Sequence, residues 1–271
     1  MTVVVGFNAF SEVVMIADTR VSWPNNTRPS QDVLQKLYPI VGSRKAAVFG
    51  FCGNIEAAKT VMVHLKERKF KRIERHFVIV TLKDYLQRWI EEVTTTQLEP
   101  EARAKLSFIL GGIEPSRHPP IKRGTKITGF LRFPEVHIYV YTVNEDNGKV
   151  AVSKRSGFAV IGSGRELEKE IEKKVYQGIR FGFKQPNLHW ARTFLIGDVI
   201  ASLFKENQSV TVGGPFQTIR ITPTGLEESY IWPPNAKWKN VEIQREATKT
   251  TIYNPVSNEK YTVYPVWELS L

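Results

Sequence analysis

The sequence predicts an α+β fold in which two β-sheets pack together and carry helices on their outer faces. This is a four-layer αββα sandwich, here with a β-rich extension at the C-terminus. Three observations predict the class: apolar strand pairs open the chain, two amphipathic helical stretches follow, and strands and helices then return in the same order. With 271 residues, of which 42% are hydrophobic, the chain can bury the core of one large domain.

The first part of the chain supplies two strand pairs and two helices. Apolar runs at 3–7 and 13–16 predict a hairpin that is buried on both sides. A second pair is expected at 33–41 and 46–51, with a turn at 42–45 between them. Two helices are expected next, because apolar residues recur with the helical period. These residues are Ile55, Ala58, Met62 and Leu65, followed by Leu82, Leu86, Trp89 and Val93.

The second part repeats this order and then adds an extension. We divide the chain into a domain over 1–222, with an insertion at about 114–133, and an extension over 223–271. A hairpin is expected in the extension at 250–263. The other elements expected are strands at 106–110, 136–142, 150–153 and 158–161, helices at 167–175 and 190–203, and a strand region at 211–222.

The net charge of +11 raises the question of nucleic acid, because clustered lysine and arginine neutralise phosphates. The basic residues are instead spread along the chain. Their densest stretches, at 66–75 and 117–126, do not interleave aromatic residues in the manner of a stacking platform. We therefore expect solvated surfaces there, with an acidic partner as the alternative, and do not expect a nucleic-acid partner.

Location and cofactors are constrained by what the sequence lacks. No apolar run approaches the roughly 20 residues of a membrane helix, and the N-terminus has no signal-like segment, so we expect a cytosolic (cytoplasmic) protein without membrane contact. Cys52 is the single cysteine, and the five histidines lie far apart. This pattern argues against a disulfide and a metal site, and we expect no cofactor.

Thr2 is the most informative candidate for catalysis. Removal of Met1, which a small second residue favours, would leave a free α-amine and a side-chain hydroxyl on one residue. An α-amine has an ordinary pKa near 8, so it could act as a base close to neutral pH. The alternative is a structural threonine, since threonine is common in strands.

Six motifs occur in a fixed order between Thr2 and about Thr222. They are Thr2-Val3-Val4-Val5-Gly6, Asp18-Thr19-Arg20, Gln35-Lys36-Leu37, Gly50-Phe51-Cys52-Gly53, Leu110-Gly111-Gly112-Ile113 and Ile161-Gly162-Ser163-Gly164. In this order they resemble proteasome β-type subunits, which are N-terminal-nucleophile hydrolases and include HslV-type bacterial peptidases and bacterial ancestral β-subunits. The resemblance implies the sandwich fold, a threonine peptidase or amidase, and a homo-oligomer that forms a ring or an open ring.

The resemblance also implies a role for each of five residues. Thr2 Oγ would attack a carbonyl, and the charge of Lys36 would lower the proton affinity of the amine and the hydroxyl. Asp18 would hold Lys36 charged and in place. The backbone N–H of Gly50, at the entrance to a helix, would stabilise the oxyanion, and Ser163 would orient the amine. Attack would give an acyl-enzyme ester that water hydrolyses.

A specificity pocket is implied by the same resemblance. It would be modest and mainly apolar, and Cys52 would be a small buried residue rather than a nucleophile, since it has no histidine partner in the sequence. The residues placed around it are Val21, Leu34, Tyr38, Val48, Cys52 and Glu56.

Three features depart from the family pattern. The stretch 207–214 lacks the carboxylate usual before the Gly-Gly pair, the insertion at 114–133 is basic, and the extension carries tryptophans that suggest a packing surface on a neighbour. One alternative is therefore an inactive proteasome-like scaffold that binds a partner through the insertion and the extension. Another is an amidase for a small molecule. The chain has no phosphate-binding loop, so any unfolding ATPase would be a separate protein.

Overall fold

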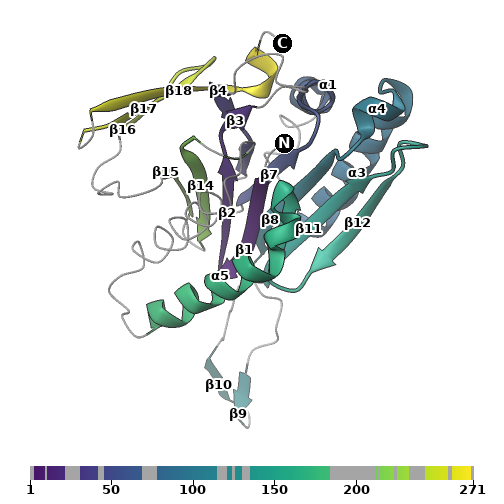
Figure 1. Cartoon of the computed structure of the whole chain (residues 1–271). Coiled ribbons are helices and arrows are strands. Elements are labelled where there is room, and N and C mark those ends of the chain that lie inside the picture. The colour runs from purple at the N-terminus through teal and green to yellow at the C-terminus, as the bar shows by residue number, and fades with distance from the viewer. Residues whose placement is uncertain are drawn as a thin grey trace.

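Two five-stranded sheets form the centre of the computed structural model (Figure 1). Every pair of neighbouring strands in the first sheet is antiparallel. In spatial order its strands are β13 (Phe158–Gly162), β1 (Val3–Ala9), β2 (Glu12–Asp18), β14 (Phe216–Thr222) and β15 (Gly225–Ile231). The structure describes residues 3–9, 11–21, 31–41, 46–68, 78–114, 121–123, 126–129, 135–183, 212, 214–222, 225–231, 242–255 and 258–269.

The second sheet is also antiparallel throughout. Its strands are β12 (Val150–Arg155), β11 (Glu135–Val143), β8 (Ser107–Glu114), β7 (Ala46–Cys52) and β6 (Leu37–Val41). An apolar cluster lies between the two sheets and includes Val13 and Met15 from the first and Ile109 from the second. Gly111 lets the sheets approach, because a Cβ there would lie 2.8 Å from Val13 Cγ1.

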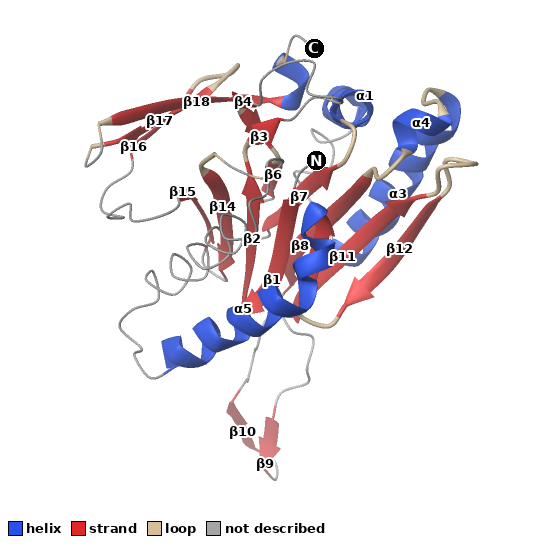
Figure 2. Cartoon of the chain, in the orientation of Figure 1, coloured by secondary structure: helices blue, strands red, loops and turns tan. Residues whose placement is uncertain are grey.

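Helices cover the outer faces of the two sheets. Helices α1 (Ile55–Arg68) and α3 (Ile79–Thr96) pack against the second sheet, and α4 (Pro100–Arg103) follows them. The 3-10 helix η2 (Ser163–Leu167) leads into α5 (Glu168–Phe183), which packs against the first sheet. Helices α3 and α5 therefore lie on opposite sides of the paired sheets (Figure 2). None of the helices described is both long and apolar enough to cross a membrane.

The described chain is thus a mixed, sheet-rich α and β fold. The second helix expected on the face of the first sheet, at 190–203, lies outside the described residues, so the complete four-layer sandwich stays a prediction. Strand β15 continues the first sheet beyond residue 222 and was not predicted. The division of the chain at that residue also stays a prediction.

A smaller sheet contains the C-terminal strands. It consists of β16 (Glu242–Arg245), β17 (Thr250–Asn254), β18 (Glu259–Pro265) and β5 (Leu34–Gln35), and the short helix η4 (Val266–Glu268) follows. Strands β17 and β18 pair across the expected turn, whereas β18 runs parallel to β5. Among the described residues there are also two short strand pairs: β3 (Arg20–Val21) with β4 (Gln31–Asp32), and β9 (Ile121–Arg123) with β10 (Lys126–Gly129). The β9–β10 pair projects away from the sheets (Figure 1).

Candidate active site

A buried ion pair joins the end of β2 to the segment between β5 and β6. Lys36 Nζ lies 2.9 Å from Asp18 Oδ1, and both side chains are 0% exposed. The same ammonium donates a hydrogen bond to the Arg20 carbonyl oxygen at 2.7 Å. Charges removed from water this completely are tolerated only where other hydrogen bonds support the pair. The predicted partners Asp18 and Lys36 are therefore brought together.

The ion pair lies beside the start of β1. The N–H of Val3 donates to Asp18 Oδ1 at 2.9 Å, and Val3 is the residue bonded to Thr2. Val3 also pairs with Gly162, which directly precedes Ser163 at the start of η2. Thr2 itself lies outside the described residues. Asp18, Lys36 and Ser163 thus belong to segments that meet at this end of β1.

Burial raises the pKa of the Asp18 carboxyl above its ordinary value. Attraction by the Lys36 ammonium and the hydrogen bond from the Val3 N–H oppose this effect. The carboxylate charge therefore depends on these two neighbours, and the second carboxylate oxygen, Oδ2, has no hydrogen-bond partner among the described residues.

Gly50 lies inside β7, opposite Leu37 on one side and Ile109 on the other. A Cβ at this position would lie 2.8 Å from Leu37 Cδ2 and 3.5 Å from the Lys36 carbonyl oxygen, so the backbone here runs close to the Lys36 segment. The expected location at a helix entrance is wrong, because α1 begins only at Ile55. The oxyanion role of Gly50 stays a prediction.

Five of the six residues expected around the specificity pocket are buried, in two different apolar clusters. Val21, Leu34 and Tyr38 pack with α1 and the C-terminal segment. Val48 and Cys52 lie instead between the two sheets. Glu56, in contrast, is exposed on α1.

The C-terminal segment itself covers Tyr38. Tyr38 Oη accepts a hydrogen bond from the Val266 N–H at 2.9 Å, and its ring lies 4.9 Å from the ring of Trp267. Next to it, Tyr264 pairs with Leu34 in the parallel β18–β5 ladder. Trp267 therefore packs within its own chain, whereas Trp232 and Trp238 lie outside the described residues.

Cys52 is held as a protonated thiol. Its Sγ lies 3.0 Å from Ser107 Oγ, and burial raises its pKa from 9.0 to about 11. Since the pKa is raised in the folded state, the resulting contribution to stability is present below pH 9 and is lost as the pH rises from about 9 to about 11.

We therefore expect Cys52 to resist alkylation in the folded protein. At pH 8 a rise of the pKa to about 11 leaves roughly a hundredfold less thiolate, and burial also blocks access. Iodoacetamide should modify the guanidinium-unfolded protein at least about a hundred times faster than the folded protein, as measured by intact mass. Equal rates in both states would contradict the buried environment.

Gln217 is a residue of the candidate site that was not predicted from the sequence. This residue is fully buried on β14, and its amide contacts the backbone of Lys36 and Leu37. It shares the inward face of β14 with Ile219 and Ile221, which belong to the cluster between the sheets. A glutamine at a core-facing strand position is the signal that could have found it.

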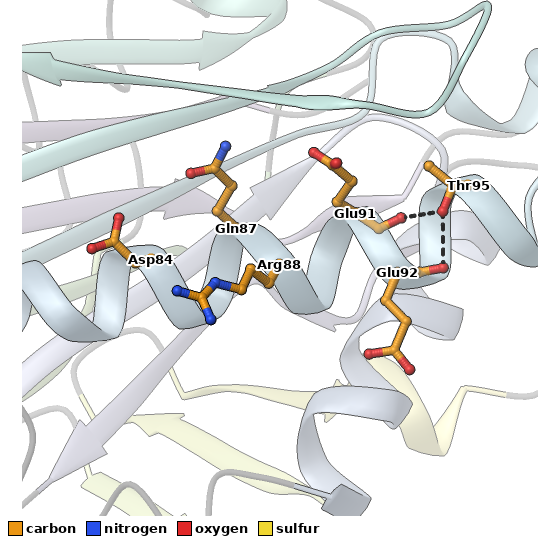
Figure 3. A pocket seen from close by; sticks show the side chains of 6 residues that line it. All are labelled: Asp84, Gln87, Arg88, Glu91, Glu92 and Thr95. Atoms are coloured by element: carbon orange, nitrogen blue, oxygen red, sulfur yellow. Dashed lines mark hydrogen bonds between the residues drawn. The ribbon is translucent and has the colours of Figure 1, made fainter.

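An open hollow on α3 is a separate feature (Figure 3). None of its lining residues is a predicted site residue. Gln87 Nε2 donates to the Val150 carbonyl, and Glu91 Oε2 accepts from the Val150 N–H, so these two side chains hold α3 on β12. The lining residues are Asp84, Gln87, Arg88, Glu91, Glu92 and Thr95. Across the ranges that the structure describes, no cluster of histidine, cysteine and carboxylate side chains could hold a metal ion.

The fold is similar to that of several solved structures. They are ancestral β-subunits, called Anbu. A mutant of Anbu from Hyphomicrobium sp. strain MC1 is 16% identical, with a TM-score of 0.53, over 86% of this chain and 89% of that chain. The helical assembly of the Anbu complex from Pseudomonas aeruginosa is 14% identical with a TM-score of 0.54, and Anbu from Yersinia bercovieri is 11% identical with a TM-score of 0.54; each match covers 86% of this chain and 88% of the other.

These comparisons correct one expectation from the sequence. The predicted closeness to HslV-type peptidases is wrong, because the similar structures are ancestral β-subunits. At 11–16% identity the likeness concerns the fold alone. No protein-family model and no curated protein match the chain.

Proposed function

We propose that the protein is a threonine-type peptidase or amidase that uses Thr2 as its nucleophile after Met1 has been removed. One observation carries the proposal: a fully buried Asp18–Lys36 pair is hydrogen-bonded to the N–H of Val3, the residue bonded to Thr2. A well-packed apolar pair could stabilise this position as well as or better than two buried charges. A chemical role would account for their presence.

The proposed reaction divides amide hydrolysis into two steps. Thr2 Oγ bonds to the substrate carbonyl carbon while the α-amine of Thr2 takes the hydroxyl proton. The C–N bond then breaks, the proton passes to the departing amine, and an ester remains on Thr2. Water attacks this ester and releases the acid. The Lys36 charge favours the unprotonated amine, and Asp18 keeps Lys36 in place.

The proposal includes self-assembly. The Pseudomonas aeruginosa relative forms a helical assembly, and the shared fold supports an oligomer for this chain too. We infer a ring or an open ring of identical subunits in the cytosol, with peptide or protein substrates and with any unfolding ATPase as a separate protein.

A peptidyl β-lactone tests the function directly. Attack by Thr2 opens the lactone ring at its acyl C–O bond and the ring oxygen takes the proton, so the protein gains the whole probe mass. Intact-mass spectrometry should show a chain that lacks Met1 and carries one probe. Thr2→Ala should lose Met1 and gain no probe, whereas Thr60→Ala, a matched change at a threonine on α1, should label like the wild type.

The outcomes separate the two candidate functions. Labelling that disappears only in Thr2→Ala supports the peptidase. If Met1 is retained, or if the processed chain never labels, the result would favour the alternative, an inactive proteasome-like scaffold that binds a partner through its insertion and extension.

A further inference from the structure

The Gln217 side chain bridges the two sheets at the backbone of the candidate catalytic lysine. Its Oε1 accepts hydrogen bonds from the N–H of Lys36 at 3.2 Å and from the N–H of Leu37 at 2.9 Å. Its Nε2 donates to the Leu37 carbonyl oxygen at 3.0 Å. The residue is 0% exposed, so water does not compete for these bonds.

These contacts replace strand pairing at Lys36, where the backbone passes from β5 to β6 and belongs to neither strand. The run expected as one strand over 33–41 is divided into β5 and β6, and Lys36 is the residue between them. Gln217 supplies the acceptor that a neighbouring strand would otherwise provide. The preceding residue, Phe216, pairs with Asp18, so β14 lies next to the carboxylate and also holds the backbone of its lysine.

The orientation of the amide is set by a second carboxylate. Gln217 Nε2 also donates to Glu228 Oε1 at 3.1 Å, and an ionised carboxylate can only accept. The Glu228 side chain is 4% exposed, and its other oxygen accepts from Arg245 Nη2 at 2.5 Å. With Nε2 facing Glu228, Oε1 must face the two backbone N–H groups. The Lys36 backbone is thereby connected, through Gln217 and Glu228, to β16 of the smaller sheet.

We propose that Gln217 is a positioning residue that holds Lys36 against Asp18 for the nucleophile. The inference rests on the proposed function of Thr2. Loss of the amide would remove the acceptor shared by the buried N–H groups of Lys36 and Leu37. The Leu37 carbonyl oxygen would lose one of its two donors and keep Gln35 Nε2. The Lys36 segment would therefore move to find a new acceptor. A small displacement of a charge from a reacting group is enough to slow a chemical step. Gln217 would thus act through Lys36 and would not touch substrate.

The test compares β-lactone labelling kinetics of Gln217→Met with those of the wild type. Methionine has a similar length but forms no comparable hydrogen bonds. We expect the maximal labelling rate to fall at least about tenfold while the half-saturating probe concentration changes less than about twofold, because Lys36 acts on the chemical step. Thr218→Val is the matched control, since Thr218 Oγ1 is buried on the same strand without a hydrogen-bond partner in the described residues.

The amplitude of labelling separates positioning from unfolding. If the variant is only less stable, a smaller fraction of the protein carries the probe at the end of the reaction, but the folded molecules label at the wild-type rate. That result would overturn the proposal. If Gln217→Met does not fold, Gln217→Asn, which keeps a shorter amide, should show the same rate loss with full amplitude. Wild-type rates in either folded variant would also overturn the proposal. If the wild type itself never labels, the proposed function has failed and the role of Gln217 fails with it.

Discussion

Replacing Lys36 with methionine is expected to lower the free energy of unfolding by about 3–5 kcal/mol, because the Asp18 carboxylate would stay buried without its cation. Urea unfolding followed by circular dichroism measures this loss. Lys83→Met is the matched control. Lys83 Nζ lies 2.8 Å from Asp84 Oδ1, but that pair is partly exposed, so the loss there should stay below about 1 kcal/mol.

The double variant Asp18→Asn/Lys36→Met separates stability from chemistry. It buries no uncompensated charge, so it should regain most of the stability lost by Lys36→Met. It should nevertheless fail to label with the β-lactone. A Lys36→Met variant that is no less stable than the control would contradict the buried ion pair. A double variant that labels at the wild-type rate would show that the ion pair has no role in the reaction of Thr2.

Replacing Val266 with aspartate is expected to lower the free energy of unfolding by about 3 kcal/mol, because a carboxylate would be buried in an apolar cluster. Val266 is 0% exposed and packs in the same cluster as Leu34 and Tyr38. Thermal and urea unfolding measure the loss. Glu268→Gln is the control, since Glu268 lies on the same short helix, 3.9 Å from Lys66 in a partly exposed pair, and should change stability by less than about 1 kcal/mol.

This second result bears on the site as well as on stability. Leu34 and Tyr38 flank Lys36 in the sequence, and both pack in the cluster that contains Val266. A large loss in Val266→Asp would show that the C-terminal segment folds together with the residues around Lys36. Unchanged unfolding would instead mean that the segment is an independent appendage.

The parts of the fold that the sequence predicted well are those with a strong local period. Strands β1 and β2 are continuous apolar runs, and the apolar residues of α3 recur on one face, including Leu82, Leu86 and Val93. Strand β15 was missed because it is rich in polar residues, whose hydrogen-bond partners lie on the neighbouring strand β14. Glu227 accepts a hydrogen bond from Arg220, and Glu228 accepts from Gln217, so these carboxylates complete bonds within the sheet rather than marking a loop.

The candidate site could likewise be predicted only in part from the sequence. Asp18 and Lys36 could be proposed because their spacing resembles a known family, and the structure brings the two together. Gln217 could not be paired with Lys36 from sequence, since 181 positions separate them. The contact of Tyr38 with Val266 spans 228 positions, so the expected pocket could not be seen to share a core with the C-terminal segment. Local pattern carries no information about such pairings.

The most direct test of the account is tandem mass spectrometry of a digest of the β-lactone-treated protein. We expect an ester on residue 2 in a peptide that begins at Thr2, with its α-amine unmodified. An ester on Ser163 or Ser107, a thioester on Cys52, or a peptide that still begins at Met1 and carries no probe would contradict the claim that Thr2 is the nucleophile served by Asp18 and Lys36.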